Sequence, residues 1–307
     1  MPMVLGSWKN VLVGILVILG IAMIYQETRA SQVFQSKYRY SLVVGSERGM
    51  VSYVSFDPEE KRILIIPLPP DLKIRSRSVG EYSVSSLYKL GEYDGNPGGF
   101  IRTKVQGFMK VPIAGYLLVS EIEEQGTKKA LLSGLLKSLI FSKNRTSMSR
   151  LDALTLLFAS QKYDYKEVDR EELVRSGAIV KEGNGYIYRE ERLGEFLKTQ
   201  VFDWAVGEEN VTVAIFNASG ENGLGSDIAE FFTNMGFDVI SVRGVENGEP
   251  LEDTTKIRIA ESDIETHRDV LRQVSGLFDW WEIEIAETEE YRADLVIFLG
   301  KDATNLF

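Results

Sequence analysis

The stretch from Val211 to Val242, VTVAIFNASGENGLGSDIAEFFTNMGFDVISV, constrains the fold more than any other part of the sequence. Its apolar runs and glycines predict a strand, a tight turn, an amphipathic helix and a second strand. Helices that alternate with strands in this way are typical of the α/β fold class. We expect a small α/β sandwich with strands over 211–216, 237–242, 255–260, 281–286 and 294–299, and helices over 224–235 and 264–275.

A glycine-rich turn before a helix is also how many proteins bind a phosphate group. Here Gly220, Gly223 and Gly225 follow the order Gly-x-x-Gly-x-Gly, whereas the dinucleotide fingerprint is Gly-x-Gly-x-x-Gly. No Lys-Ser or Lys-Thr pair follows for a P-loop. We therefore expect Asn217 and Gly220 to make the turn and Gly225 to let the helix pack closely on the strand. Nucleotide binding is the weakest functional alternative.

The charges divide the chain into two unlike parts. Residues 206–307 contain 22 acidic and 7 basic residues, a net charge of −15, and residues 1–205 have a net charge of +5. This difference predicts a domain over 39–205 and an acidic domain over 206–307. The acidic domain should repel nucleic acid, so we expect no nucleic-acid partner. With no cysteine and only His267, the chain has no disulfide and no cysteine-based metal site.

An uncharged run of sixteen residues, NVLVGILVILGIAMIY, occupies positions 10–25. As a helix it would be about 24 Å long, slightly shorter than a ~30 Å hydrocarbon core. We expect an uncleaved transmembrane helix over 10–25, between a short segment over 1–9 and a polar stalk over 26–38. A cleaved signal peptide is the alternative. The charges on the two sides leave both topologies open.

The middle of the chain predicts a mixed α/β layer. Short runs of β-branched and aromatic residues predict strands, and FDPEEKR between the second and third run predicts a hairpin. We expect strands over 38–46, 49–58 and 61–69, and helices over 84–93, 98–110, 127–143 and 149–161. Ser149 is the expected N-cap of the last helix. The helix before it should carry one apolar stripe of Ala130, Leu131, Leu135, Leu139 and Ile140.

The last third has five short motifs: Asn-Ala-Ser at 217–219, Gly-Leu-Gly at 223–225, Gly-Phe at 236–237, Ala-Asp at 293–294 and Leu-Gly-Lys-Asp at 299–302. They resemble the C-terminal domain attached to LytR-type cell-envelope proteins, whose pattern is Asn-Gly-Thr/Ser, Gly-Leu-Ala, Gly-Phe, and Ala-Asp through Leu-Gly-x-Asp. Ala218 and Gly225 depart from that pattern, each by one small residue for another, which does not threaten the fold. The resemblance implies a non-catalytic accessory domain.

Two segments between about Tyr40 and Val119 read SLVVGSERGMVSYVSFDPEEKRILIIPLPPDLKI and EYSVSSLYKLGEYDGNPGGFIRTKVQGFMKVPIAGYLLV. Together they are similar to the start of a LytR–CpsA–Psr (LCP) catalytic domain. Such enzymes move a glycopolymer from a polyprenyl diphosphate onto peptidoglycan. The resemblance therefore implies phosphoryl transfer, with arginines for the diphosphate and acids for a divalent metal such as Mg²⁺.

Several positions depart from that catalytic pattern. Glu47 stands where the family has the aspartate of Gly-x-Asp, and the acid of the next strand falls near Gly49. Pro70 replaces the arginine of the Pro-Arg-Asp motif and leaves only Asp71. Because a metal ligand and a phosphate clamp are both missing, the domain looks degenerate. Glu47 and Asp71 are the vestigial catalytic candidates and the only metal ligands to consider, and we expect no metal.

Five basic residues remain around the implied pocket. They form either a weakened lipid-diphosphate site or, in the reading we favour, an exposed strand edge (Arg75 and Arg77) and a solvated helix face (Arg102 and Lys104). The candidate ligand-binding residues are Arg48, Arg75, Arg77, Arg102 and Lys104.

Three hypotheses follow. The first is a non-catalytic envelope protein that binds peptidoglycan, a polyprenyl-linked glycopolymer or another envelope protein, and needs no cofactor. The second is a divergent Mg²⁺-dependent phosphotransferase. The third is a tethered nucleotide-binding module. The family resemblance, rather than the charge count, favours a single-pass protein of a bacterial cell membrane with most of the chain outside the cytoplasm.

Overall fold

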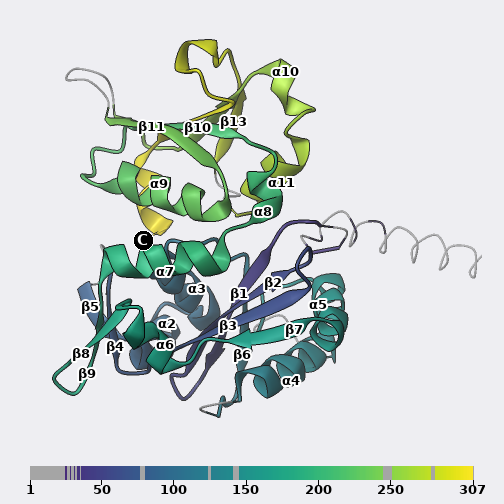
Figure 1. Cartoon of the computed structure of the whole chain (residues 1–307), viewed down its shortest axis with the longest axis vertical. Coiled ribbons are helices and arrows are strands. Elements are labelled where there is room, and N and C mark those ends of the chain that lie inside the picture. The colour runs from purple at the N-terminus through teal and green to yellow at the C-terminus, as the bar shows by residue number, and fades with distance from the viewer. Residues whose placement is uncertain are drawn as a thin grey trace, which may run out of the picture.

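The computed structural model describes residues 25, 28, 31, 33, 34, 36–76, 80–123, 126–140, 145–244, 251–277 and 281–306, with only the backbone at 272, 273 and 275–277. The segment expected over 1–9 and, apart from Tyr25, the transmembrane helix expected over 10–25 lie outside these residues. Within the described ranges, no helix is both long and apolar enough to cross a membrane. Two α/β domains are stacked on each other (Figure 1).

The first domain is built on a five-stranded sheet in the order β6-β1-β2-β3-β7. Strands β1 (Tyr40–Ser46), β2 (Val51–Asp57) and β3 (Arg62–Leu68) form an antiparallel meander, which confirms the predicted strands and hairpin. Strands β6 (Gly115–Val119) and β7 (Asp164–Glu167) pair parallel to β1 and β3. All residues of β1 and β2 are buried, because helices cover both faces of the sheet.

Alternate side chains of the central strands point to two different helical layers. Val43, Tyr53 and Leu64 face helices α2 (Leu87–Tyr93) and α3 (Pro97–Met109). Leu42, Val54 and Ile63 face helices α4 (Thr127–Ile140) and α5 (Arg150–Lys162). The four predicted helices are confirmed, and Ser149 Oγ accepts from the Asp152 amide at 3.0 Å as the expected N-cap.

The apolar stripe predicted on α4 is confirmed only in part. Ala130, Leu131 and Leu135 are buried, but 66% of Ile140 is exposed. Ile140 lies nine residues after Leu131, which is half a helical turn away from the buried face. The stripe therefore leaves the core toward the C-terminal end of α4.

A second, four-stranded sheet in the order β5-β4-β9-β8 extends the core beneath α3. Its strands are β4 (Leu72–Ser76), β5 (Gly80–Ser83), β8 (Ile179–Glu182) and β9 (Gly185–Tyr188). The short 3-10 helix η1 (Val84–Ser86) and the helices α6 (Arg170–Arg175) and α7 (Glu190–Val201) complete the domain.

The second domain is a five-stranded sheet in the order β11-β10-β14-β12-β13. Every strand predicted from Val211 onward is present, and so is the helix over 224–235, which is α9. The strands are β10 (Thr212–Asn217), β11 (Asp238–Gly244), β12 (Lys256–Ile259), β13 (Glu282–Ile285) and β14 (Leu295–Leu299); the other elements are α9 (Leu224–Met235), α10 (Glu261–Ile264), α11 (Arg268–Leu277), η2 (Glu289–Tyr291) and η3 (Lys301–Leu306).

The single helix predicted over 264–275 is wrong in its N-terminal part. A turn over 265–267 separates α10 from α11. Glu261, Glu265 and Asp269 are spaced four residues apart, and like charges at this spacing destabilise a continuous helix.

The turn before α9 has the structural role predicted for it. Asn217 Nδ2 donates to the Glu221 carbonyl at 2.8 Å, and Gly220 has a φ of +81°. A Cβ on Gly225 would lie 3.1 Å from Val242 Cγ1 and 3.4 Å from Asn217 Cβ. Glycine at 225 therefore allows α9 to lie close to β10 and β11.

The chain before β1 contacts both domains. Ser31 Oγ and the Val33 amide donate to Asp152 at the start of α5. Tyr38 is buried in the core of the second domain, where its hydroxyl donates to Glu209. Ser31, Val33 and Tyr38 of the stalk thus lie against the folded body.

Candidate functional site

The turn between β1 and β2 places Glu47 and Arg48 in two separate, exposed ion pairs. Glu47 Oε1 accepts from Arg145 Nη2 at 3.2 Å, and Arg48 pairs with Glu121. About half or more of each of these four side chains is exposed. Exposed pairs of this kind contribute little free energy, so neither residue is held in a preorganised site.

Gly49 has a backbone reason to lack a side chain. Its φ is +82°, and a Cβ there would lie 2.4 Å from the Ser85 carbonyl oxygen. The Gly49 amide donates to the Ser46 carbonyl at 3.0 Å, which closes a tight turn. An acidic side chain at this position would therefore require the turn and η1 to move apart.

Asp71 lies in the turn between β3 and β4 with its side chain exposed. Its carbonyl accepts from the Tyr186 amide at 3.3 Å, and the carbonyl of Pro70 accepts from the Ser85 amide at 2.9 Å. Pro70 and Gly49 thus both contact Ser85, and the loops that carry them meet there. In the described part of the chain, no three His, Cys, Asp or Glu side chains form a group that could hold a metal ion.

The basic candidates separate into different surfaces. Arg75 lies on the solvent side of β4, 77% exposed and 3.8 Å from Glu81. It is exposed as predicted, but the expected strand edge is wrong, because β4 lies between β5 and β9 and Arg75 is on the face of the sheet. Arg77 lies outside the described residues. Because side chains alternate along a strand, Ser76 points the opposite way, into the domain, and is buried.

For Lys104 the prediction of a solvated helix face is wrong. It is only 9% exposed, and its Nζ donates to Ser76 Oγ at 2.9 Å and lies 5.7 Å from the centre of the Phe100 ring. Burial lowers the pKa of Lys104, against the opposing effect of the Asp94 carboxylate. On the same helix Arg102 is half-buried.

Arg102 and Lys104 border an open pocket of about 440 Å³ at the N-terminal half of α3. Asn96 caps this helix, since its Oδ1 accepts from the Gly99 amide at 3.0 Å. The pocket is lined by Asp94, Asn96, Gly99, Phe100, Arg102, Thr103 and Lys104. Two of the predicted basic ligands, Arg102 and Lys104, therefore border one pocket.

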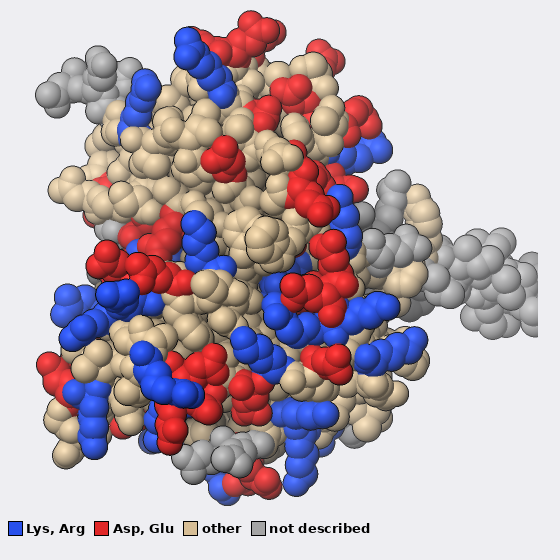
Figure 2. Space-filling view, viewed as in Figure 1, with Lys and Arg blue, Asp and Glu red and all other residues tan. Residues whose placement is uncertain are grey.

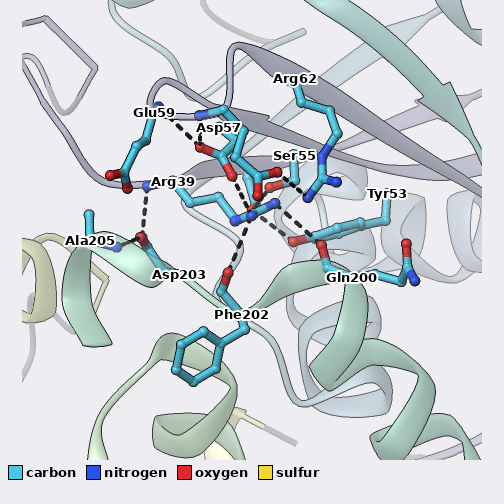
Figure 3. A network of polar contacts seen from close by, with 12 residues as sticks. Arg39, Tyr53, Ser55, Asp57, Glu59, Arg62, Gln200, Phe202, Asp203 and Ala205 are labelled. Atoms are coloured by element: carbon cyan, nitrogen blue, oxygen red, sulfur yellow. Dashed lines mark hydrogen bonds and ion pairs between the residues drawn. The ribbon is translucent and has the colours of Figure 1, made fainter. Parts of the chain in front are cut away.

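A buried polar network at the domain junction was not predicted (Figure 3). Arg39 Nη2 donates to Asp57 Oδ2 at 2.6 Å and to the Phe202 carbonyl at 3.2 Å. The Arg39 amide donates to Asp203 Oδ2 at 2.7 Å, and the Ala205 amide donates to Asp203 Oδ1 at 3.1 Å. Burial raises the pKa of Asp203 despite these donors. The network fixes the start of β1 to the β2–β3 hairpin and to the chain leaving α7.

A second unpredicted contact joins the domains at Lys110. Its Nζ bonds Glu190 of α7, Asp227 at 3.0 Å and Glu230 at 2.7 Å, the last two on α9. Burial would lower the pKa of Lys110, but the three carboxylates raise it. Asn234 Nδ2 donates to the Lys110 carbonyl at 2.8 Å. Figure 1 shows α7 and α9 side by side at this interface.

The aspartates of the C-terminal motif hold the second domain together. Asp294 Oδ2 accepts from the Thr212 amide and hydroxyl at 2.8 and 2.7 Å. Asp302 accepts from the Thr255 amide at 2.9 Å, and Gly300 passes so close to Thr254 that no Cβ fits. These motif residues are structural, since they stabilise strand ends rather than line a pocket.

Taken with its fold, this arrangement defines a two-domain α/β protein whose domains are joined by buried charged groups. Residues 210–302 match the LytR_C family, described as "LytR cell envelope-related transcriptional attenuator". The second domain is therefore a LytR_C domain, which confirms the resemblance predicted for it. No curated protein matches the chain.

Solved structures similar to this chain include proteins of Bacillus subtilis. TagV is 13% identical over 54% of this chain and 96% of its own, with a TM-score of 0.36, and TagU is 9% identical over 52% and 93%, with a TM-score of 0.37. The "LytR-CPS2A-psr family protein YwtF (TagT)" with bound octaprenyl pyrophosphate lipid is 10% identical over 52% and 87%, with a TM-score of 0.34. TM-scores below 0.5 are too low to assign a function.

Proposed function

We propose that this protein is a membrane-anchored cell-envelope protein whose first domain binds an envelope component without catalysing transfer. The observation that carries the proposal is Gly49, where the backbone excludes the acidic side chain that the LCP pattern requires. The binding partner is peptidoglycan, a polyprenyl-linked glycopolymer or an envelope protein. The LytR_C match supports the cell-envelope setting.

The placement of the remaining candidates supports a non-catalytic role. Transfer of a phosphoryl group needs a metal and cations preorganised around one diphosphate. Glu47 and Arg48 are engaged in exposed pairs with Arg145 and Glu121, and Arg75 faces solvent beside Glu81. In this proposal the run over 10–25 anchors the protein, and both domains lie outside the cytoplasm.

One observation favours the alternative, a divergent phosphotransferase. Lys104 and Arg102 lie at the same 440 Å³ pocket, and a buried lysine with a lowered pKa is a feature of functional sites. In that alternative the two cations hold the diphosphate, and Glu47 and Asp71 would have to supply the ligands for Mg²⁺.

The two functions differ in their dependence on Mg²⁺ and Asp71. Full-length protein in lipid nanodiscs would be titrated calorimetrically with a short-chain polyprenyl diphosphate, with and without Mg²⁺. It would also be assayed for release of polyprenyl monophosphate from a glycopolymer linked to polyprenyl diphosphate, because transfer of the glycopolymer-bearing phosphoryl group leaves the second phosphate on the lipid. We expect no Mg²⁺-dependent release and the same titration for wild type and Asp71→Ala. Release that Asp71→Ala abolishes, but that Asp164→Ala on β7 leaves intact, would establish the transferase instead.

The binding role has its own measurement. Purified peptidoglycan sacculi, with and without attached glycopolymer, would be sedimented with the nanodisc-held protein. We expect retention on one of the two preparations. If the protein is retained on neither preparation and does not bind the lipid diphosphate, peptidoglycan and the polyprenyl-linked glycopolymer are excluded as partners. An envelope protein would then be the remaining partner.

A further inference from the structure

The outer surface of the α4–α5 pair combines exposed apolar side chains with lysines. We define this α4–α5 face by Lys129, Leu136, Lys137, Ile140, Leu154 and Phe158, all exposed. Leu136 and Ile140 are four residues apart on α4, as are Leu154 and Phe158 on α5, so each pair lies on one side of its helix. The two helices pack against each other (Figure 1).

The apolar side chains on this face are large and mostly exposed to solvent. The exposed fractions are 53% for Leu136, 66% for Ile140 and 55% for Phe158. Clustered exposed apolar residues mark interaction sites more often than scattered ones do.

Within the segment 126–163 the charge is strongly one-sided, and among the described residues the two lysines of the face form one ion pair, the exposed contact of Lys129 with Glu123 at 3.5 Å. Residues 126–163 contain seven basic residues and one acidic residue. That acid, Asp152, is only 4% exposed, and its carboxylate accepts hydrogen bonds from the Ser31 hydroxyl, the Val33 amide and the hydroxyl of the N-cap Ser149. The chain as a whole has a net charge of −10. Figure 2 likewise shows more basic side chains over the first domain, at the bottom of the view, than over the second.

The apolar run of the sequence is attached next to this face. Ser31 and Val33 contact Asp152 at the start of α5. Tyr25, the last residue of that run, is six residues before Ser31, a distance of at most about 22 Å along an extended chain. A membrane entered by residues 10–25 would therefore lie close to α5.

We propose that the α4–α5 face lies on the surface of an anionic lipid bilayer. Leu136, Ile140 and Phe158 enter the headgroup region, as apolar side chains of interfacial helices do, and the lysines contact anionic headgroups. This inference rests on the membrane anchorage in the proposed function, and adds which side of the first domain faces the lipid. The pocket at α3 lies on the opposite side of the sheet, facing away from the bilayer.

The absence of cysteine makes a single-site label straightforward. Ile140→Cys and Phe158→Cys would each carry an environment-sensitive fluorophore on full-length protein reconstituted in phosphatidylglycerol–phosphatidylcholine vesicles. Tyr93→Cys is the matched control, because Tyr93 is 92% exposed on α2, in the helical layer on the other face of the sheet. We expect spin-labelled lipid to quench the labels at 140 and 158, and not the label at 93.

The charge contribution is tested by reversal. Lys129→Glu with Lys137→Glu should reduce quenching at position 140, and the matched pair Lys89→Glu with Lys181→Glu should not. Because one lysine near an anionic surface contributes about a five-fold factor, the double reversal should weaken contact by more than ten-fold. Replacing phosphatidylglycerol by phosphatidylcholine should likewise reduce quenching at position 140.

The outcomes separate the two proposals. Protein that floats with the vesicles but shows no quenching at 140 or 158 contradicts the membrane-facing side and leaves the anchorage standing. Protein that does not float contradicts both. A label at 140 whose emission shifts to the blue, but which lipid-borne quencher does not reach, would place protein rather than lipid on this face and would overturn the inference.

Discussion

At the scale of single residues, the meaning of a position depends on its backbone and its neighbours. Gly49 replaces an expected acid because its φ is positive and Ser85 occupies the space of a side chain. Lys104 carries a charge that the sequence places on a helix surface, and yet it is buried against Ser76. A motif comparison sees only the residue type at each of these positions.

Gly49→Ala should destabilise the first domain by about 3 kcal/mol, since it combines a left-handed backbone conformation with a clash against a carbonyl. Gly80→Ala is the control: Gly80 also has a positive φ, +87°, but nothing lies within 4 Å of its Cβ position. The Gly80→Ala variant should lose only about 1 kcal/mol of unfolding free energy. Urea denaturation followed by far-UV circular dichroism measures both, and equal losses would show that contact with Ser85 is unimportant.

At the scale of elements, local patterns were sufficient for most strands and helices. The runs over 38–69 and from Val211 onward predicted their strands because alternation and turn residues are encoded within a few positions. The polar network was not predictable in this way. Arg39 meets Asp57 eighteen residues later and Asp203 164 residues later, and no local pattern marks partners at such separations. The same holds for Lys110 and its carboxylates.

The packing of α9 on its sheet gives a prediction at this scale. Gly225→Ala should change stability by less than about 0.5 kcal/mol, because better helix propensity offsets a 3.1 Å contact with the movable Val242 side chain. Gly225→Leu should cost about 2 kcal/mol, since its side chain must push α9 away from β11. Thermal denaturation of full-length protein measures the pair. A tolerated leucine would contradict the close approach.

At the scale of the whole molecule, the charged cluster around Lys110 joins the two domains, and the buried network around Arg39 fixes the chain that leads into the second domain. Lys110 neutralises carboxylates from α7 and α9, and Arg39 ties the start of β1 to the chain between α7 and α8 (Trp204–Gly207). Both clusters lie where the second domain meets the first. The relative position of the domains is thus specified by side-chain chemistry as well as by apolar contact.

Lys110→Met should loosen this interface by about 1–3 kcal/mol, because it leaves acidic groups of both domains without their shared cation. The loss is smaller than for a fully buried pair since Glu190 is 64% exposed. Lys301→Met, which breaks only the exposed pair with Asp253, should leave the melting temperature unchanged. Scanning calorimetry would compare the two; equal effects would mean that Lys110 does not join the domains.

The same lysine predicts a pH dependence. Because the folded-state pKa of Lys110 is raised above the ordinary value of 10.5, its stabilisation is fully present below pH 10.5 and is lost as the pH rises through the raised pKa. The difference in melting temperature between wild type and Lys110→Met should therefore be constant from pH 7 to 10 and shrink above pH 10.5. A difference that persists unchanged at higher pH would argue against a charge effect.

The way the chain enters the first sheet has a mechanical consequence. Strand β1 is an inner strand, with hydrogen bonds to β2 on one side and β6 on the other. The residues at and before its start are held by Asp152, Asp203 and the core of the second domain. A tensile load on the N-terminal end would have to break side-chain contacts in both domains first. It would then have to shear two hydrogen-bonded ladders at once, whereas an edge strand could be peeled off bond by bond.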